Sequence, residues 1–287
     1  MAFTKIKEYI DTDMGTAGTL LIPKLIMPAM IEEVDKTLLP REMAAQVWSP
    51  NQIQGSSFTV NLEEVDSMSI RSVGEGAEFV LDNQGYDSVT FTPVKYGVAI
   101  RITREMMEDS QFELLQRNIR LAGKRFAENE TKLIITALDG ASTTVAGGAQ
   151  ITIANITEAM QDLEDVDYVA TDFIVGNEVV NDLRNIDTFV EANKAGNTDM
   201  LSRGFVGSIF GINVARFSAS TKVSPSATYK KYAYMFDRSQ AYGIAIKRDL
   251  SVENFMLPTF DMEGAVISQR IDVELLRSDA IVKITTA

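Results

Sequence analysis

The chain has 287 residues, a formal net charge of −13, and neither cysteine nor histidine. Without these two residue types, disulfides, thiolate catalysis, cysteine-ligated metal sites and histidine-dependent serine triads are excluded. The acidic balance disfavours binding to nucleic-acid phosphates, whereas a hydrophobic fraction of 45% is enough for an ordinary folded core. Any enzyme built on this chain would have to use carboxylate, lysine, tyrosine or serine–lysine chemistry.

Residues 1–50 are predicted to form an extended N-terminal arm. Glycine and proline interrupt the segment too often for one long helix, and only residues 27–39 have the spacing of a short one. The apolar run at 19–30 is broken by prolines and a lysine, so neither a signal peptide nor a membrane span is expected. An arm with apolar residues of its own needs a surface on which to lie.

Residues 51–103 are predicted to form one long β-hairpin. Apolar and polar side chains alternate at 57–62 and again at 88–103, which is typical of strands with one apolar face. The polar, glycine-containing residues 63–87 lie between them and would form an elaborated tip. Each leg could reach about 50–60 Å when extended. Since a two-stranded hairpin is marginal alone in water, its apolar stripe needs a partner surface.

Residues 104–138 give the strongest helix prediction, with Thr103 as its N-cap and Gly140 just past its end. About 35 residues of helix would run roughly 50 Å, which is long for a globular domain. The apolar stripe, with Glu, Arg and Lys expected opposite, consists of Leu114, Leu115, Ile119, Ala122, Phe126, Leu133, Ile134 and Ala137.

The small residues at 139–150 predict a flexible hinge and a domain boundary. After it we expect a strand and a helix capped at Asn155, then a buried strand at 168–176 and a short helix capped at Asn177. Residues 190–204 read as a polar loop, and the remainder as mostly strands. There, Tyr232 and Tyr234 are spaced to share one strand face, which indicates sheet packing rather than a base-stacking platform.

Three candidate sites around the hairpin tip are weak. Gly74-Glu75-Gly76 neither follows a strand into a helix nor contains the lysine of a phosphate-binding loop. Glu75 and Glu78 could act as an acid–base pair only in a water-poor pocket, which a polar loop does not provide. Glu63, Glu64 and Asp66 lack the ligand spacing of a calcium loop. We therefore expect no catalytic residue, cofactor or metal, and interpret the tip as a structural clamp between subunits.

Several motifs resemble the major capsid proteins of tailed bacteriophages, which have the Hong Kong 97-like fold. The resemblance covers nearly the whole chain. Its most specific part is VGEGAEF (73–79) followed by VTFTPVKYGVAIRITREMMEDS (89–110), similar to the family's extended loop returning into its spine helix. GTAGTLLIPKLIMPAMIEEV (15–34) looks like the family's arm motif, and FGINVARFSAS (210–220) and GAVISQRIDVELLRSDAIVKIT (264–285) look like its later sheet elements.

The resemblance implies an α+β chain in four parts. These are an N-terminal arm (1–50), an extended-loop hairpin (51–103), a peripheral domain with the spine helix (104–155 and 259–287), and an axial α/β domain (156–258). It also implies a virion protein, assembled in the host cytoplasm, that forms hexamers and pentamers of an icosahedral shell around double-stranded DNA. Because the chain begins at the arm, a separate scaffolding protein is expected beside a portal, with a cement protein as a possible addition.

The namesake phage joins its subunits covalently through Lys and Asn, but residues 51–94 contain no lysine here. Non-covalent contacts, or a cement protein, would therefore hold the shell together. Our interface candidates are Arg71, Glu75, Glu78, Phe79, Lys95, Lys194 and Arg203. Ion pairs between subunits are expected at Arg71, Glu75, Glu78 and Lys95, each contributing under about 1 kcal/mol.

Two other functions remain open from the sequence alone. An encapsulin-type compartment shares the implied fold but encloses enzymes, and the arm motif argues for the virus instead. A carboxylate-based hydrolase would be a monomer or small oligomer with a closed pocket, and no motif in the chain supports it.

Overall fold

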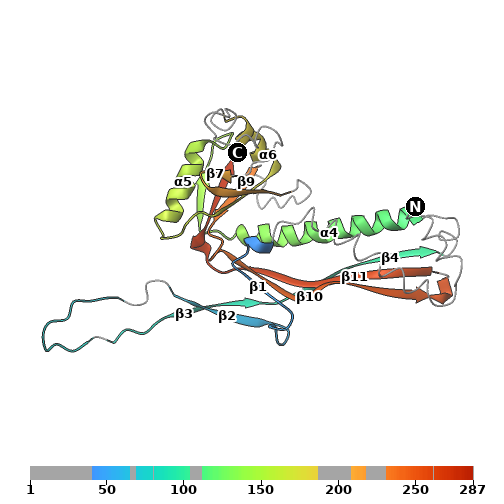
Figure 1. Ribbon diagram of the computed structural model, residues 1–287, viewed down its shortest axis with the longest axis horizontal. Coiled ribbons are helices and arrows are strands. Elements are labelled where there is room, and N and C mark those ends of the chain that lie inside the picture. The colour runs from blue at the N-terminus through green and yellow to red at the C-terminus, as the bar shows by residue number, and fades with distance from the viewer. Residues whose placement is uncertain are drawn as a thin grey trace.

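The computed structural model describes residues 41–64, 69–79, 81–103, 112–186, 208–217, 231–260 and 262–286. The described residues form two β-sheets, a two-stranded ribbon and three α-helices (Figure 1). The helices are α4 (Phe112–Leu138), α5 (Ile153–Glu164) and α6 (Asn177–Arg184), with 3-10 turns η1 (Arg41–Met43), η2 (Pro258–Phe260) and η3 (Ser278–Ala280). None of these helices is long and apolar enough to cross a membrane.

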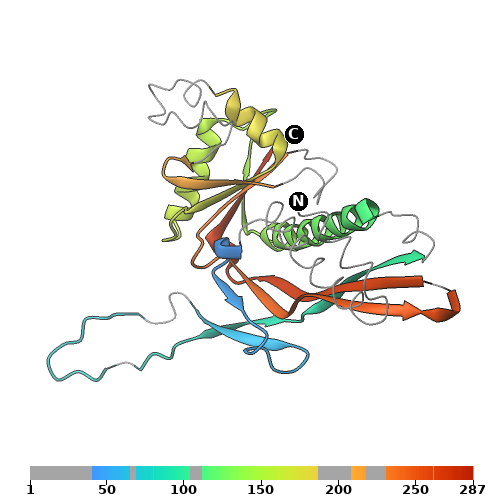
Figure 2. The ribbon, with the colours of Figure 1, turned by 45° about the vertical axis from the view of Figure 1, so that its right-hand side comes forward.

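The first sheet has four strands in the order β1-β10-β11-β4, and α4 lies along one of its faces (Figures 1 and 2). Its strands are β1 (Gln46–Trp48), β10 (Tyr242–Leu257), β11 (Met262–Leu275) and β4 (Val94–Thr103). β11 pairs antiparallel with both β10 and β4, whereas β1 pairs parallel to β10 at the edge. The last residues of the predicted arm, 41–50, thus include an edge strand of this sheet.

Helix α4 confirms the predicted C-terminal end and the apolar spacing from Ala122 onward. The side chains of Leu114, Leu115 and Ile119 lie outside the described residues. Phe126 packs against Ile267 of β11, and Ile134 and Leu138 pack in the cluster that holds Ile271. The proposed start of the helix lies in residues 104–111, outside the described residues, and Thr103 itself is the last residue of β4.

The charged side of α4 differs from the prediction, because Glu130 lies in the helix–sheet interface with its side chain 2% exposed. Arg41 reaches it with two hydrogen bonds, Nε to Oε1 at 2.6 Å and a terminal nitrogen to Oε2 at 2.9 Å. Gln269 of β11 donates a third at 3.1 Å. A buried carboxylate is tolerated when it is paired and hydrogen-bonded in this way. The hydrogen bond to Glu130 is also the main reason why the pKa of Arg41 is raised.

The second sheet has six strands in the order β5-β12-β9-β6-β8-β7 and carries α5 and α6. Its strands are β5 (Thr143–Ala146), β12 (Ile281–Thr286), β9 (Lys231–Phe236), β6 (Asp172–Val175), β8 (Ile212–Arg216) and β7 (Ser208–Ile209). All four residues of β6 are buried because the strand runs between β9 and β8. This confirms the buried strand predicted within 168–176.

Both predicted caps of the short helices were misplaced. Thr152, not Asn155, is the N-cap of α5, and its side chain accepts from the Asn155 N–H while Asn155 reaches back to the Thr152 N–H. This reciprocal capping box starts the helix where a strand was expected. Helix α6 begins after Gly176 rather than with Asn177 as the cap, and Gly176 makes no side-chain cap bond.

Strand pairing divides the chain differently from the predicted boundaries. The supposed hinge at 139–150 contains β5, which pairs parallel with β12. Residues 259–287 were expected to join one sheet with the long helix, yet β12 lies in the six-stranded sheet, and β10, expected in the other domain, pairs with β11. Long-range pairing decides these memberships, and local sequence patterns do not report it.

A polar contact joins the end of α4 to the six-stranded sheet. Asp139, the residue after α4, is hydrogen-bonded to Lys283 of β12 and accepts a bond of 3.2 Å from the Tyr234 hydroxyl of β9. Burial raises the pKa of Tyr234, so the hydroxyl keeps its proton as a donor. Tyr232 and Tyr234 both lie in the core, as their spacing predicted.

Candidate assembly interface

The hairpin forms from two strands that overlap the predicted alternating runs. Strands β2 (Phe58–Glu63) and β3 (Tyr86–Phe91) pair antiparallel, with Phe58 opposite Phe91 and Glu63 opposite Tyr86. Phe58, Val60 and Val89 turn toward the body and pack partly buried against it. On the other side, the Thr59 and Thr90 hydroxyls lie 3.1 Å apart across the strands.

The second leg of the hairpin is shorter than predicted. The run 88–103 breaks at Thr92-Pro93, after which β4 joins the four-stranded sheet. Proline has no N–H for a strand ladder, which fits a change of partner at this point. The hairpin therefore consists of a ribbon, β2 with β3, and a loop of residues 64–85 beyond it, called here the extended loop.

The extended loop projects away from both sheets (Figures 1 and 2). Residues 69–79 are all exposed and contain no strand or helix. At its far end the Ala77 N–H donates to the Gly74 carbonyl at 3.0 Å, and Gly76 has φ +79°, as position i+2 of a type II turn requires. The described loop residues thus make a turn in open space, without a helix N-terminus or cavity for a phosphate.

A polar contact around Asp82 joins the two sides of the extended loop. Asp82 accepts from the Ser69 N–H and hydroxyl, both at 3.2 Å, and pairs with Arg71 at 3.3 Å. The backbone hydrogen bond from Ser69 is the largest of the contributions that lower the pKa of Asp82. Since these groups are solvent-exposed, the contact shapes the loop more than it stabilises the subunit.

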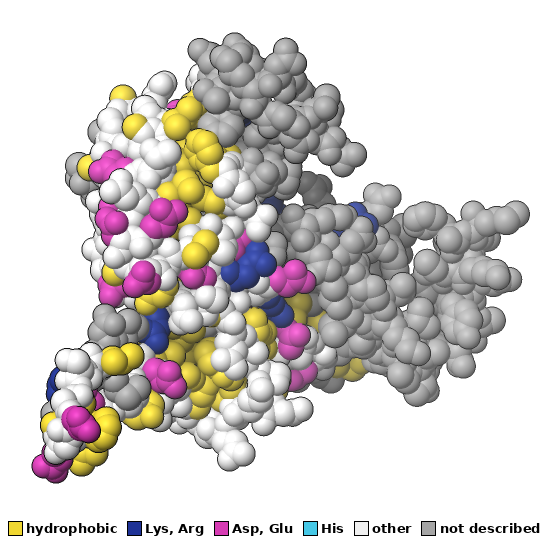
Figure 3. All heavy atoms as spheres, turned by 60° about the vertical axis from the view of Figure 1, so that its left-hand side comes forward, with side chains coloured by type: hydrophobic (Ala, Val, Ile, Leu, Met, Phe, Trp, Pro, Cys, Tyr) yellow, Lys and Arg dark blue, Asp and Glu magenta, His cyan; other side chains and the backbone are white. Residues whose placement is uncertain are grey.

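Large apolar side chains on the extended loop and the end of the ribbon lie open to solvent. Leu81 is 93% exposed and Phe79 is 76% exposed. Ile70, Val73 and Tyr86 are exposed as well, and Figure 3 shows hydrophobic and acidic side chains along this projection. A run of exposed apolar residues on a thin projection marks a surface for contact with another molecule.

An aromatic cluster anchors the ribbon to the four-stranded sheet. Trp48 of β1 lies edge-on to Phe58, with ring centroids 5.4 Å apart, and 4.9 Å from Phe91. Phe58 and Phe91 stack at 5.1 Å. Gly243 of β10 leaves room for the indole, because a Cβ there would lie 2.4 Å from Trp48 Cζ3.

The predicted interface residues are only partly described. Arg71, Glu75, Glu78 and Phe79 all lie on the extended loop, and Lys95 is exposed on β4, where it pairs in register with Arg270. Within the subunit, the ion-pair partner of Arg71 is Asp82. Lys194 and Arg203 lie outside the described residues. Among the described residues, no group of three or more carboxylates is arranged to hold a metal ion.

Sequence reasoning missed the residues that connect the loop to the body. The single tryptophan, Trp48, was an available signal, because so large a side chain on a short strand needs a cavity to fill. Arg270, Asp272 and Arg277 gave no such signal, since each acts through a contact with a distant backbone atom.

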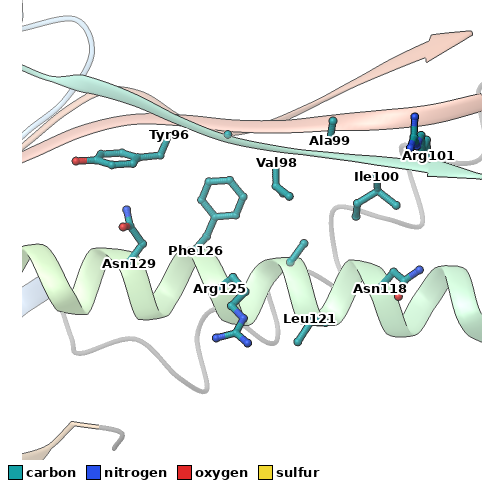
Figure 4. A pocket seen from close by; sticks show the side chains of 12 residues that line it. Tyr96, Val98, Ala99, Ile100, Arg101, Asn118, Leu121, Arg125, Phe126 and Asn129 are labelled. Atoms are coloured by element: carbon teal, nitrogen blue, oxygen red, sulfur yellow. The ribbon is translucent and has the colours of Figure 1, made fainter. Parts of the chain in front are cut away.

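A second apolar surface is an open groove of about 530 Å³ between α4 and β4 (Figure 4). Val98 and Ile100 point from β4 toward the helix, and Phe126 points from the helix toward the strand. Arg101, Arg125, Asn118 and Asn129 also line the groove. The groove therefore combines an apolar floor with polar and basic edges.

Comparisons with known proteins agree with this geometry. A sequence profile described as phage capsid protein matches residues 86–284. A search of curated protein sequences finds no match. The matched profile thus covers β3 and nearly all of the chain that follows it.

Solved capsid structures are similar in fold. A chain of Mycobacterium phage Che8 has a TM-score of 0.64 at 15% identity, covering 80% of this chain and 85% of that one. The acid-stable capsid of Helicobacter pylori bacteriophage KHP30 gives 0.67 at 13% identity, with coverage of 84% and 86%. The capsid of a native GTA particle gives 0.63 at 17% identity, with coverage of 88% and 92%. At these identities the likeness shows a shared fold.

Proposed function

The chain belongs to the phage capsid protein family and is a major capsid protein, a structural subunit of an icosahedral shell, and we propose that its copies hold one another through the extended loop. The observation that carries this proposal is the row of exposed apolar side chains on a loop that projects away from its own subunit. Such a loop gains stability only where a neighbouring copy covers it. Contacts of this head-to-tail kind close into rings, which fits hexamers and pentamers.

The two sheets are the basis on which we divide the subunit into two domains. We assign the four-stranded sheet with α4 to the peripheral domain, and the six-stranded sheet with α5 and α6 to the axial domain. The arm and the extended loop would then make the contacts between subunits. Arg71, Glu75, Glu78 and Phe79 stay candidates for these contacts, together with Lys95, Lys194 and Arg203.

The partners outside the shell protein follow from this role. The shell would enclose double-stranded DNA, be assembled in the host cytoplasm with a separate scaffolding protein and a portal, and could carry a cement protein. The net charge of −13 supports an inner surface that does not hold phosphates tightly, so that DNA can be packed. The match to phage capsid proteins favours this role over an encapsulin-type compartment.

The first test changes the apolar residues of the loop. We expect Phe79→Ser with Leu81→Ser to leave the free energy of unfolding of the isolated subunit within about 0.5 kcal/mol of the parent, since both side chains are exposed. Shell yield, counted by electron microscopy and gel filtration, should fall at least about tenfold. Covering Phe and Leu contributes about 1.5–3 kcal/mol each, and 1.4 kcal/mol already corresponds to a factor of ten.

A matched control changes two polar residues of the same loop. Ser72→Asn with Asn83→Ser keeps every apolar side chain and should assemble as the parent does. Parental shell yield from the Phe79→Ser, Leu81→Ser variant would show that the loop does not hold the shell.

A second test concerns covalent linkage. Because residues 51–94 contain no lysine, the ribbon and extended loop cannot supply the amine for a Lys–Asn bond between subunits. Purified shells boiled in SDS should therefore release a 31.6 kDa monomer. A ladder of dimers and higher oligomers that survives boiling would contradict this prediction.

A further inference from the structure

The direction in which the extended loop leaves the subunit needs a physical cause. The chain enters the ribbon from β1 through residues 49–57 and leaves it for β4 through Thr92 and Pro93. The aromatic cluster around Trp48 holds the inner half of the ribbon, from Phe58 and Phe91 to Val60 and Val89. Attachment at one end allows pivoting, whereas a second attachment farther along the ribbon fixes its angle.

Two side chains of β11 hold the bend between ribbon and sheet. Asp272 accepts from the Thr92 N–H at 2.6 Å, and Arg270 donates from Nε to the Pro93 carbonyl at 2.8 Å. Arg270 and Asp272 alternate with Ile271 and Val273, which face the core under α4. They therefore lie on the face of the sheet opposite the helix.

The second attachment comes from Arg277, just beyond the end of β11. Its guanidinium donates to the Glu63 carbonyl at 2.6 Å. Glu63 is the last residue of β2, five residues from Phe58, or about 17 Å along the strand. Thus Arg277 holds the ribbon at its far end, where the extended loop begins.

The backbone beside Arg277 is itself fixed to the body. The Leu276 N–H donates to the Ala241 carbonyl at 2.9 Å, in the connection between β9 and β10. The Leu276 side chain packs into the aromatic cluster with Phe58 and Val60. One short segment therefore contacts the junction of the two sheets, the inner end of the ribbon and its outer end.

We propose that Arg270, Asp272 and Arg277 form a loop clamp, in which Arg277 is the positioning residue that sets the direction of the extended loop. This inference rests on the proposed function for its consequence, because a loop held at one angle meets a neighbouring copy without an ordering cost. The clamp itself is a property of the single subunit. It can therefore be tested before any shell forms.

The test measures the loop angle in dissociated full-length subunits. Because the chain has no cysteine, Glu75→Cys on the loop and Lys132→Cys on α4 introduce two unique sites for spin labels, both exposed. Pulsed electron–electron double resonance then gives the distribution of distances between the two spin labels. With Arg277→Met added, we expect the distribution to broaden about twofold, since the outer end of the ribbon is released. Arg277→Lys, which keeps one donor, should restore part of the narrow distribution.

The matched control is Arg248→Met, which removes the same charge from an exposed residue of β10 and should leave the distribution unchanged. An Arg277→Met distribution as narrow as the control would overturn the clamp. Should Arg277→Met fail to fold, Asp272→Ala, which releases the Thr92 N–H, must broaden the distribution instead. An unchanged distribution in that variant overturns the clamp equally.

Shell assembly by unlabelled variants separates the clamp from the function. A lower shell yield for Arg277→Met than for Arg248→Met supports the consequence for assembly. Broadened distances with parental yield would overturn that consequence. If the parent and the control also form no shells, the proposed function fails, while the distance measurement still decides the clamp.

Discussion

Replacing Trp48 with alanine is expected to destabilise the subunit by about 3–5 kcal/mol, the range for truncating a buried tryptophan. The indole is 8% exposed and contacts Phe58 and Phe91, so its loss opens a cavity between the ribbon and the four-stranded sheet. Chemical unfolding followed by circular dichroism gives the free energy, because the only tryptophan is removed and fluorescence no longer reports on the transition.

Val47→Ala is the matched control, because Val47 precedes Trp48 on the same strand but is exposed. Val47→Ala should change the free energy of unfolding by no more than about 0.5 kcal/mol. Gly243→Ala adds a specific check, since its methyl group would clash with the indole at 2.4 Å. We expect Gly243→Ala to lower the free energy of unfolding of the parent more than that of the Trp48→Ala variant. Equal costs in both backgrounds, or a Trp48→Ala effect no larger than that of Val47→Ala, would contradict the anchoring role.

Local patterns predicted the elements whose stability depends on one apolar face. The pairing of β2 with β3 could be expected from the two alternating runs, because each run has one apolar face to bury. The apolar stripe on α4 could be predicted for the same reason, because apolar residues recur there with the period of a helix. The projecting loop followed from a physical argument as well, since a hairpin with legs of about 50–60 Å is too long for its own subunit to cover.

Contacts between distant residues could not be predicted from these patterns. Glu130 sits in the helix–sheet interface because Arg41, 89 positions away, supplies its hydrogen bonds. β5 and β12 pair over a gap of more than 130 residues, so the small residues of β5 looked like a hinge. The loop clamp is missed similarly, because Arg277 acts on the backbone carbonyl of Glu63, which carries no sequence signal.

An ion pair of the six-stranded sheet joins Asp172 and Arg238. Asp172, the first residue of β6, is fully buried. Arg238 donates to both of its carboxylate oxygens, at 2.8 and 2.7 Å, and the Thr171 hydroxyl donates a third bond at 3.1 Å. Arg238 lies in the connection from β9 to β10, so the pair also fixes the path of the chain between the two sheets.

Arg238→Met is therefore expected to cost about 3 kcal/mol of unfolding free energy at neutral pH, because it leaves the Asp172 carboxylate buried without its cation. Adding Asp172→Asn should recover part of this loss, since a neutral amide costs less to bury than a charge. Arg248→Met, which removes an exposed arginine 3.8 Å from Glu253, should change stability by less than about 0.5 kcal/mol. Urea unfolding of the four proteins makes the comparison, and an Arg238→Met loss that Asp172→Asn does not reduce would show that lost packing, rather than an unpaired charge, causes it.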